Sequence, residues 1–368
     1  MAYPVLPLFL RSLGAPAAAI GLVEGLADAT ANVLKGVSGV RSDQRRERLP
    51  YVRWGYGLSA AGKPLIALAY TWPLVIFARV LDRYGKGIRT TARDALLADA
   101  SPPGKLGAVF GLHRAMDTAG AFVGVLITLA LLQFLSIEHR TIFLLAGIPG
   151  FLAVVLALGL REQRPPVPEE AAAVRVPIFK ALGEALKGSP ALRSIIVLHA
   201  VFALANTSDA FLLMHAKDQG FSETAVIGAY LFYNVAYAAL SYPAGKVSDK
   251  IGRWPVVAAG WLLYALVYMG FAWAGASWTW PLFLLYGVYV ALTQGVAKAQ
   301  VAELASKEQK GTVLGAFYMI SGICSLLGNL AFGVIWDRFS PETALLSAAG
   351  VAGIAVLSVP FVRKAVRS

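Results

Sequence analysis

The sequence contains a single cysteine and four histidines in 368 residues. Cys324 lies inside an apolar run, so an intrachain disulfide is impossible and no thiol cluster is present to bind a metal. The histidines at 113, 139, 199 and 215 are scattered, without the spacing of metal ligands or of a nucleophile and its base. The phosphate-binding loop of ATP-driven proteins is also missing, because "GKGIRTT" lacks its spacing and a preceding strand. We therefore predict neither an enzyme nor a metal or cofactor site.

Charge is scarce as well, at 15% of residues against 57% hydrophobic residues. Apolar runs long enough to cross about 30 Å of hydrocarbon as helices recur along the chain. The runs are continuous rather than alternating, which excludes a membrane barrel of strands. The sequence predicts an all-α polytopic membrane protein, with spans near 16–40, 52–71, 73–92, 106–134, 140–160, 193–215, 222–244, 254–274, 279–300, 311–335 and 342–362.

The net charge of +12 is concentrated in alternate loops. Lysine and arginine cluster at 41–48, 161–187, 246–253, 307–310 and 363–367, and the intervening loops are nearly without them. The positive-inside rule places these basic loops and both termini in the cytoplasm. We expect a multi-pass protein of the plasma (inner) membrane, in contact with lipid, monomeric and without a nucleic-acid partner.

The two halves of the sequence resemble each other in the same orientation. "SGVRSDQRRER" at 38–48 resembles "AGKVSDKIGR" at 244–253, with Asp43 opposite Asp249 at an offset of 206. Gly107 and Gly311 match at an offset of 204. We predict two six-helix bundles related by a parallel repeat, at 1–160 and 193–364, joined by a cytoplasmic linker at 161–192. The counterpart of 191–206 is absent from the first half, so we expect an incomplete first helix. Either the reading frame begins further upstream, which we prefer, or the protein is a natural truncation.

"GKVSDKIGR", residues 245–253, matches the loop signature of the major facilitator superfamily, and the chain resembles these transporters over nearly its full length. The first-half copy keeps two of the signature residues but has Gln44 and Arg46 at two others. The resemblance implies two rocking bundles and a cytoplasmic gate. Its expected gate residues are Gly39, Asp43, Gly245, Asp249, Gly252 and Arg253.

Charged side chains inside the predicted spans should face protein or water, because an unpaired charge in lipid costs several kcal/mol. Arg79 and Arg83 lie within one span, and Arg79 resembles the fourth-helix arginine that the family uses in proton coupling. Glu24 and Asp28 project from one face of another span, with Asp28 near the membrane midplane. A static ion pair of Asp28 with Arg79 or Arg114 is the alternative to proton coupling.

A second set of polar residues is rich in aromatic and amide groups, which is typical of a site for a partly apolar organic molecule. Interfacial tyrosines that only anchor the protein in the membrane would give a similar pattern. The set comprises Asn206, Asp209, Tyr233, Asn234, Tyr237 and Gln294, with Tyr286 and Tyr289 nearby. Arg114 and Asp117, in "GLHRAMDTAG" of another predicted span, are further candidates for proton coupling or substrate binding.

These features together favour secondary active transport of a small organic molecule by alternating access. Export by proton antiport is preferred, because the resemblance leans to bacterial efflux proteins and the polar face of residues 16–40 is acidic. The alternatives are proton-coupled uptake of a small organic acid or metabolite, and a membrane protein that binds lipid or a partner without transporting.

Overall fold

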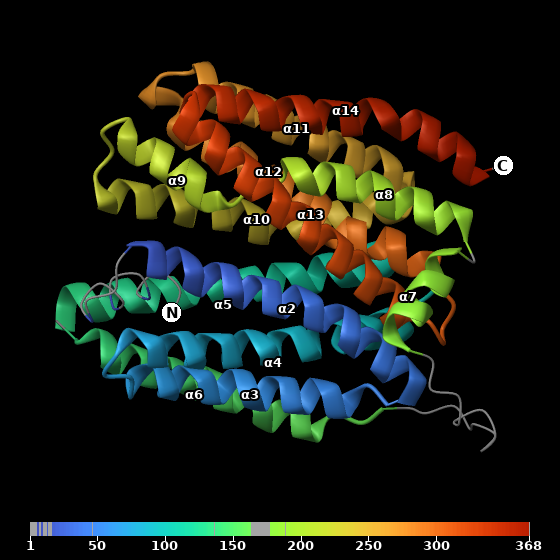
Figure 1. Cartoon of the computed structure of the whole chain (residues 1–368), viewed down its shortest axis with the longest axis horizontal. Coiled ribbons are helices and arrows are strands. Elements are labelled where there is room, and N and C mark those ends of the chain that lie inside the picture. The colour runs from blue at the N-terminus through green and yellow to red at the C-terminus, as the bar shows by residue number, and fades with distance from the viewer. Residues whose placement is uncertain are drawn as a thin grey trace. The chain divides into compact units, whose positions relative to one another are not determined.

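The computed structural model describes residues 6, 9, 13, 17–45, 47–135, 137–162, 177–187 and 189–367. Within these ranges, side chains are not described at 17–29, 132, 133, 185, 210, 214, 217, 223, 224, 227 and 365–367. The described residues form α-helices and one short 3-10 helix, with no strand among them (Figure 1). The predicted all-α fold is therefore confirmed.

Most helices follow the predicted spans, but the span predicted at 193–215 is divided between two helices. The first half contains α2 (Ala17–Arg45), α3 (Leu49–Ala67), α4 (Trp72–Asp99), α5 (Leu106–Leu135) and α6 (His139–Gly159). A short helix, α7 (Ile178–Lys187), precedes the second half. The second half contains α8 (Pro190–Ala205), α9 (Asp209–Asp218), α10 (Glu223–Ile251), α11 (Arg253–Trp273), η2 (Ala276–Trp278), α12 (Thr279–Glu303), α13 (Lys310–Arg338) and α14 (Pro341–Arg367).

Local sequence explains several of the helix boundaries. Ser189 accepts a hydrogen bond from the Leu192 amide at 3.2 Å and is followed by a proline, so it starts α8 as an N-cap. Ser222 starts α10 in the same way. Gly252 alone separates α10 from α11, and its φ of 92° is a conformation that glycine adopts without strain.

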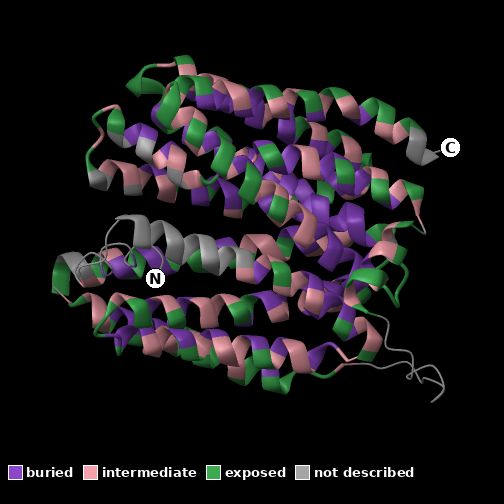
Figure 2. Ribbon diagram, in the orientation of Figure 1, coloured by how far each residue is buried: buried purple, intermediate pink, exposed green. Residues whose placement is uncertain are grey.

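Six helices among the described residues are long and apolar enough to cross a membrane. They are Leu106–Leu131, His139–Gly159, Arg253–Trp273, Ala276–Glu303, Lys310–Arg338 and Pro341–Lys364. The helix α4 has the length but carries charged side chains from Arg79 to Asp99. Exposed apolar side chains along α6 and α14, such as Phe151 and Leu357, are those expected of helices in contact with lipid (Figure 2).

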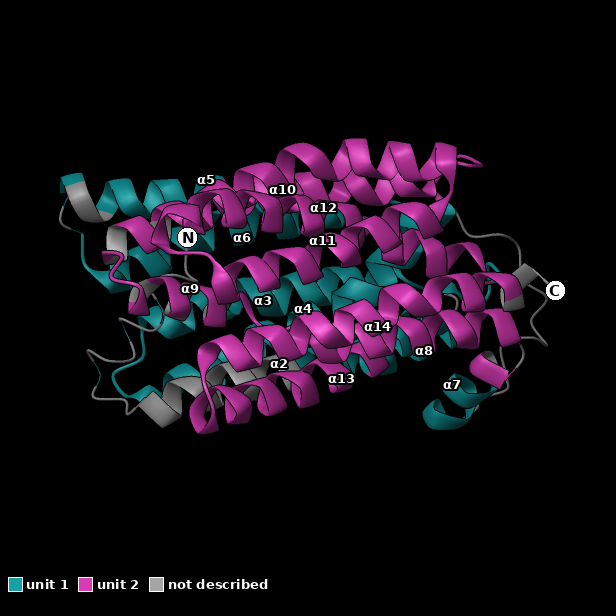
Figure 3. Cartoon of the chain, turned by 90° about the horizontal axis from the view of Figure 1, so that it is seen from above, with its two compact units in different colours: residues 1–99, 123–185, 306–319 teal, residues 100–122, 186–305, 320–368 magenta. Residues whose placement is uncertain are grey.

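The chain forms two compact units, and each takes a segment from the other half of the sequence (Figure 3). The first unit contains residues 1–99, 123–185 and 306–319, and the second contains 100–122, 186–305 and 320–368. In the first unit α4 packs against α2 and α3, and α3 packs against α6. In the second unit α11 packs against α12 and α14, around the fully buried Trp261, Tyr264 and Tyr268. The helices α5 and α13 each pass from one unit into the other.

Candidate functional site

The span predicted at 193–215 is interrupted in the structure, because α8 ends at Ala205 and α9 begins at Asp209. Side chains of neighbouring helices replace the helical hydrogen bonds that the break removes. The Ser208 amide donates to Asn329 Oδ1 at 2.7 Å, and the Tyr264 hydroxyl donates to the Ala205 carbonyl. Ala205 is buried, and a buried carbonyl without such a partner would cost about 1–3 kcal/mol. The break is therefore stabilised by specific hydrogen bonds within the second unit.

Two tyrosines of α12 bind the polar side chains on either side of this break. The Tyr286 hydroxyl donates to Asp209 Oδ1 at 2.7 Å, and the Tyr289 hydroxyl donates to Asn206 Oδ1 at 2.8 Å. Tyr233 of α10 forms a second hydrogen bond with Asp209. Both α12 tyrosines are buried, and Asp209 is the first residue of α9, where the helix dipole favours a negative charge. Two phenols and the backbone amide of Asp209 itself are the described hydrogen-bond partners of this carboxylate.

The tyrosines continue from Asp209 toward charged residues of α5. The ring of Tyr233 lies 5.4 Å from that of Tyr286 and 6.1 Å from that of Tyr237. Tyr237 in turn is hydrogen-bonded to Thr118 and interacts electrostatically with Arg114. The resulting row of side chains, called here the polar row, comprises Asp209, Tyr286, Tyr233, Tyr237, Arg114, Asp117 and Gln294.

Arg114 organises the end of the polar row that lies on α5. Its guanidinium donates to Asp117 Oδ2 at 3.1 Å and to Gln294 Oε1 at 3.0 Å. Asp117 remains 57% exposed although it belongs to a helix that could cross a membrane. A half-exposed carboxylate at such a depth needs water or a polar ligand rather than lipid.

The structure thus brings together most of the predicted substrate residues of the second unit. Asn234 differs from them, because its amide donates to the Tyr230 carbonyl of the same helix at 2.7 Å. Arg79 and Arg83 belong to α4 in the first unit, where Arg79 is buried and lies 3.5 Å from Asp82 in an ion pair. The predictions for Glu24 and Asp28 rest on side chains that lie outside the described residues.

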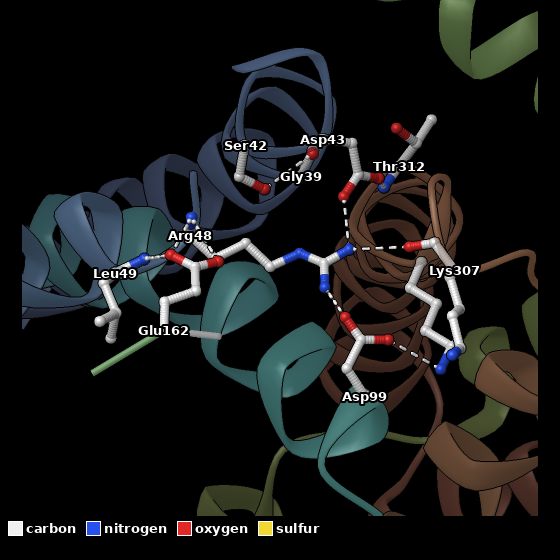
Figure 4. A network of polar contacts seen from close by, with 10 residues as sticks. Gly39, Ser42, Asp43, Arg48, Leu49, Asp99, Glu162, Lys307 and Thr312 are labelled. Atoms are coloured by element: carbon white, nitrogen blue, oxygen red, sulfur yellow. Dashed lines mark hydrogen bonds and ion pairs between the residues drawn. The ribbon is translucent and has the colours of Figure 1, made fainter. Parts of the chain in front are cut away.

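The expected gate residues of the first half belong to a network of ion pairs and hydrogen bonds (Figure 4). Asp43 Oδ1 lies 2.9 Å from the Arg48 guanidinium, and Asp43 Oδ2 accepts a hydrogen bond from the Thr312 amide at 2.6 Å. Gly39 allows this approach, because a Cβ there would lie 2.1 Å from the Gly311 carbonyl oxygen. The contact holds the start of α13 against the end of α2 within the first unit.

Arg48 is the hub of this network. Its side chain is buried, pairs with both Asp43 and Asp99, and donates to the Lys307 carbonyl at 3.1 Å. Lys310 then pairs with Asp99 at 2.9 Å. We call Asp43, Arg48, Asp99, Lys310 and the Thr312 amide the first network. Burial raises the pKa of the Asp43 carboxyl, against the opposing effects of the Arg48 guanidinium and the Thr312 amide.

The second half builds the same arrangement in the second unit. Asp249 accepts hydrogen bonds from the Gly107 amide at 2.8 Å and the Ala108 amide at 2.7 Å, and it pairs with Arg253. Arg253 also lies 3.4 Å from Glu303. These five residues form what we call the second network. Gly245 again permits close approach, because a Cβ there would lie 2.1 Å from the carbonyl oxygen of Gly107.

The sequence contained a signal for the hub of the first network that the motif comparison missed. Arg48 follows Asp43 by five residues and Arg253 follows Asp249 by four, so the two arginines end the repeated segment one position out of register. Asp99 aligns with Glu303 at the offset of 204. The comparison considered only the signature positions Gln44 and Arg46. The structure shows that the arginine after the loop, rather than the basic residue inside it, pairs with the aspartate.

Comparisons with known proteins agree with this architecture. The family model of the Major Facilitator Superfamily matches residues 1–329. The chain is 36% identical to an uncharacterised MFS-type transporter of Methanocaldococcus jannaschii, over 98% of this chain and 90% of the relative. It is 26% identical to the multidrug resistance protein MdtH of Cronobacter sakazakii, over 98% of this chain and 90% of that relative.

Solved structures show the same fold. The Escherichia coli fucose:proton symporter FucP matches with a TM-score of 0.77 at 14% identity, over 97% of this chain and 93% of its own. The human organic anion transporter MFSD10 matches with a TM-score of 0.71 at 18% identity, over 96% of this chain and 88% of its own.

Proposed function

This chain belongs to the Major Facilitator Superfamily of membrane transporters, and we propose that it exports a small organic molecule in exchange for protons. The observation that carries the proposal is Asp209, a partly buried carboxylate at a broken helix, hydrogen-bonded to Tyr286 and Tyr233. Phenol hydroxyls can serve a neutral carboxylic acid as well as a carboxylate. Asp209 can therefore gain or lose a proton without leaving a buried cation unpaired.

The polar row gives such a carboxylate a way to couple protons to a substrate. Tyrosine faces bind apolar and cationic groups, and a charged Asp209 would hold a positively charged or polar molecule beside them. Protonation of Asp209 would remove that attraction and favour release. Because proton and substrate would compete for one carboxylate, each would leave as the other binds, which is the stoichiometric requirement of antiport.

The networks at Asp43 and Asp249 supply a structural element that alternating access requires. Asp43 holds the start of α13, and Asp249 holds the start of α5. Each carboxylate accepts hydrogen bonds from backbone amides at 2.6 to 2.8 Å, and these distances depend on how the helices pack. We propose that these contacts form when the cytoplasmic gate closes and break when it opens. The resistance named in the MdtH relatives supports the outward direction of transport.

Arg114 favours a second candidate, proton-coupled uptake of a small organic acid. Its side chain is 22% exposed and its guanidinium is already oriented by Gln294, so it could bind a carboxylate of a substrate. The charge of the transported molecule separates the two candidates, because an exporter of the first kind would prefer cations and the second would prefer anions.

The test is proton release from acid-loaded inside-out vesicles on addition of cationic, neutral and anionic compounds. The exporter predicts release with cationic or neutral compounds, lost in Asp209→Asn and retained in Asp337→Asn, whose carboxylate is exposed on α13. A normal proton response in Asp209→Asn would refute the role of this carboxylate. A response to anions alone would replace export by the second candidate.

A further inference from the structure

The start of α3 lacks a local cap. Arg48 stands at the N-cap position, and its side chain makes no capping hydrogen bond. The first amides of a helix need acceptors when they are not in water. Here the acceptor comes from a residue 114 positions later in the chain, because Glu162 binds the Arg48 amide at 3.1 and 3.2 Å and the Leu49 amide at 3.1 Å (Figure 4).

A second set of hydrogen bonds joins α3 to the end of α6, and here α3 supplies the donor. Arg53 of α3 donates to three carbonyls at the end of α6, those of Ala157 at 3.2 Å, Leu158 at 3.1 Å and Leu160 at 2.7 Å. A cation at the C-terminal end of a helix also interacts favourably with its dipole. The point where the chain leaves α6 is thus fastened to the first turns of α3.

Glu162 therefore holds the backbone of the residue whose side chain is the hub of the first network. From this backbone position the Arg48 guanidinium contacts Asp43, Asp99 and the Lys307 carbonyl. The second network differs here. The N-cap of α11 is Gly252, which makes no side-chain capping hydrogen bond.

We infer that Glu162 is a positioning residue for Arg48, and that the beginning of the segment between the halves controls the opening of the first network. A displacement of Glu162 would release the start of α3 and misplace the guanidinium, which would loosen the hold on α13. This inference rests on the proposed role of the first network in gate closure. It gives the segment after α6 a task beyond joining the two halves.

The experiment measures opening of the network without any substrate. Ser42 is fully buried one residue before Asp43, so a thiol placed there reacts only when this region opens. The reporter is Ser42→Cys in a Cys324→Ser background, purified and reconstituted in liposomes, with the rate of maleimide labelling as the readout. The matched control is Glu184→Gln, which makes the same chemical change at an exposed position of α7.

We expect Glu162→Gln to label roughly tenfold faster than the parent, a change of about 1.4 kcal/mol in the opening equilibrium. Glu184→Gln should label at the parental rate. In an Arg48→Ala background, which removes the hub, Glu162→Gln should add less than twofold, because the two residues act through one contact. If Glu162→Gln does not assemble, Arg53→Gln replaces it with the same expectations.

Two results would overturn the inference. One is parental labelling in Glu162→Gln, which would mean that the cap does not govern opening. The other is an equal acceleration with and without Arg48, which would show that Glu162 only stabilises α3. Because labelling uses no substrate, a failure of the proposed export activity would leave this result unaffected, and the two proposals can fail separately.

Discussion

Asp249→Ala should slow transport far more than it weakens substrate binding. The carboxylate accepts two backbone amides at the start of α5, at 2.8 and 2.7 Å, and pairs with Arg253. Removal of the acceptor leaves the buried Arg253 guanidinium with the Ser248 hydroxyl at 2.9 Å and, as its charged partner, the Glu303 carboxylate at 3.4 Å. Loss of one partner of a buried charge pair typically costs about 3–5 kcal/mol, so we take about 3 kcal/mol for this partly compensated case.

A cost of about 3 kcal/mol shifts the equilibrium between the assembled and opened second network roughly 150-fold toward the opened form. If every transport cycle passes through the assembled form, turnover should fall at least tenfold. Binding to the polar row should change less than about twofold, because Asp249 touches none of its residues.

The assay compares the turnover of proteoliposomes with equilibrium binding of the same substrate to the same preparation. Asp337→Ala, at an exposed position of α13, controls for the loss of a carboxylate. Parental turnover in Asp249→Ala, or a loss of binding in proportion to turnover, would refute the reasoning.

Three further predictions concern other elements. Asp28→Asn should abolish proton-coupled transport while the protein stays folded in the membrane, and normal proton coupling in vesicles would contradict this. Gly245→Ala places a Cβ 2.1 Å from the carbonyl oxygen of Gly107, so its thermal unfolding temperature and turnover should both fall, whereas Gly57→Ala, with nothing within 4 Å, should leave both unchanged. Because burial raises the pKa of Asp43, the assembled first network binds a proton more readily than the opened one. Protonation of Asp43 therefore stabilises the assembled first network. This stabilisation is complete below the pKa of an exposed aspartate, about 4, and is lost as the pH rises through the raised pKa of Asp43. Labelling of the Ser42→Cys reporter, normalised to the denatured chain, should accelerate over that pH range and lose this dependence in Asp43→Asn.

The positions of the helices were predictable because apolar runs of membrane length have few alternative structures. The break between α8 and α9 was missed, although residues 206–209, Asn-Thr-Ser-Asp, are a polar cluster typical of loops. The interruption is stabilised by side chains that form hydrogen bonds with the backbone at the break. Tyr264 and Asn329 lie on other helices, and the local sequence does not predict that they contact the break.

The candidate site was predictable in part. Residue types that are costly in lipid identified Arg114, Asp117 and Asp209 without any alignment. Their arrangement depends on helix packing, which the local sequence does not specify. Asn234, for example, forms a hydrogen bond within its own helix and does not belong to the polar row. Arg48 and Glu162 were missed because their roles come from partners up to 259 residues away.

The two networks differ in when they can form during synthesis. The amides that Asp249 needs precede it in the chain by 141 and 142 positions, so they already exist when α10 emerges from the ribosome. Asp43 must wait for Thr312, which is 269 residues later. At about 5–20 residues per second this delay is roughly 13–54 s. During that interval the Asp43 carboxylate at the end of α2 lacks its amide donor, so the first network of the nascent chain stays incomplete. The closure of the first network is therefore a late event in the biogenesis of the protein, and a chain arrested before α13 would carry a completed second network and an open first one.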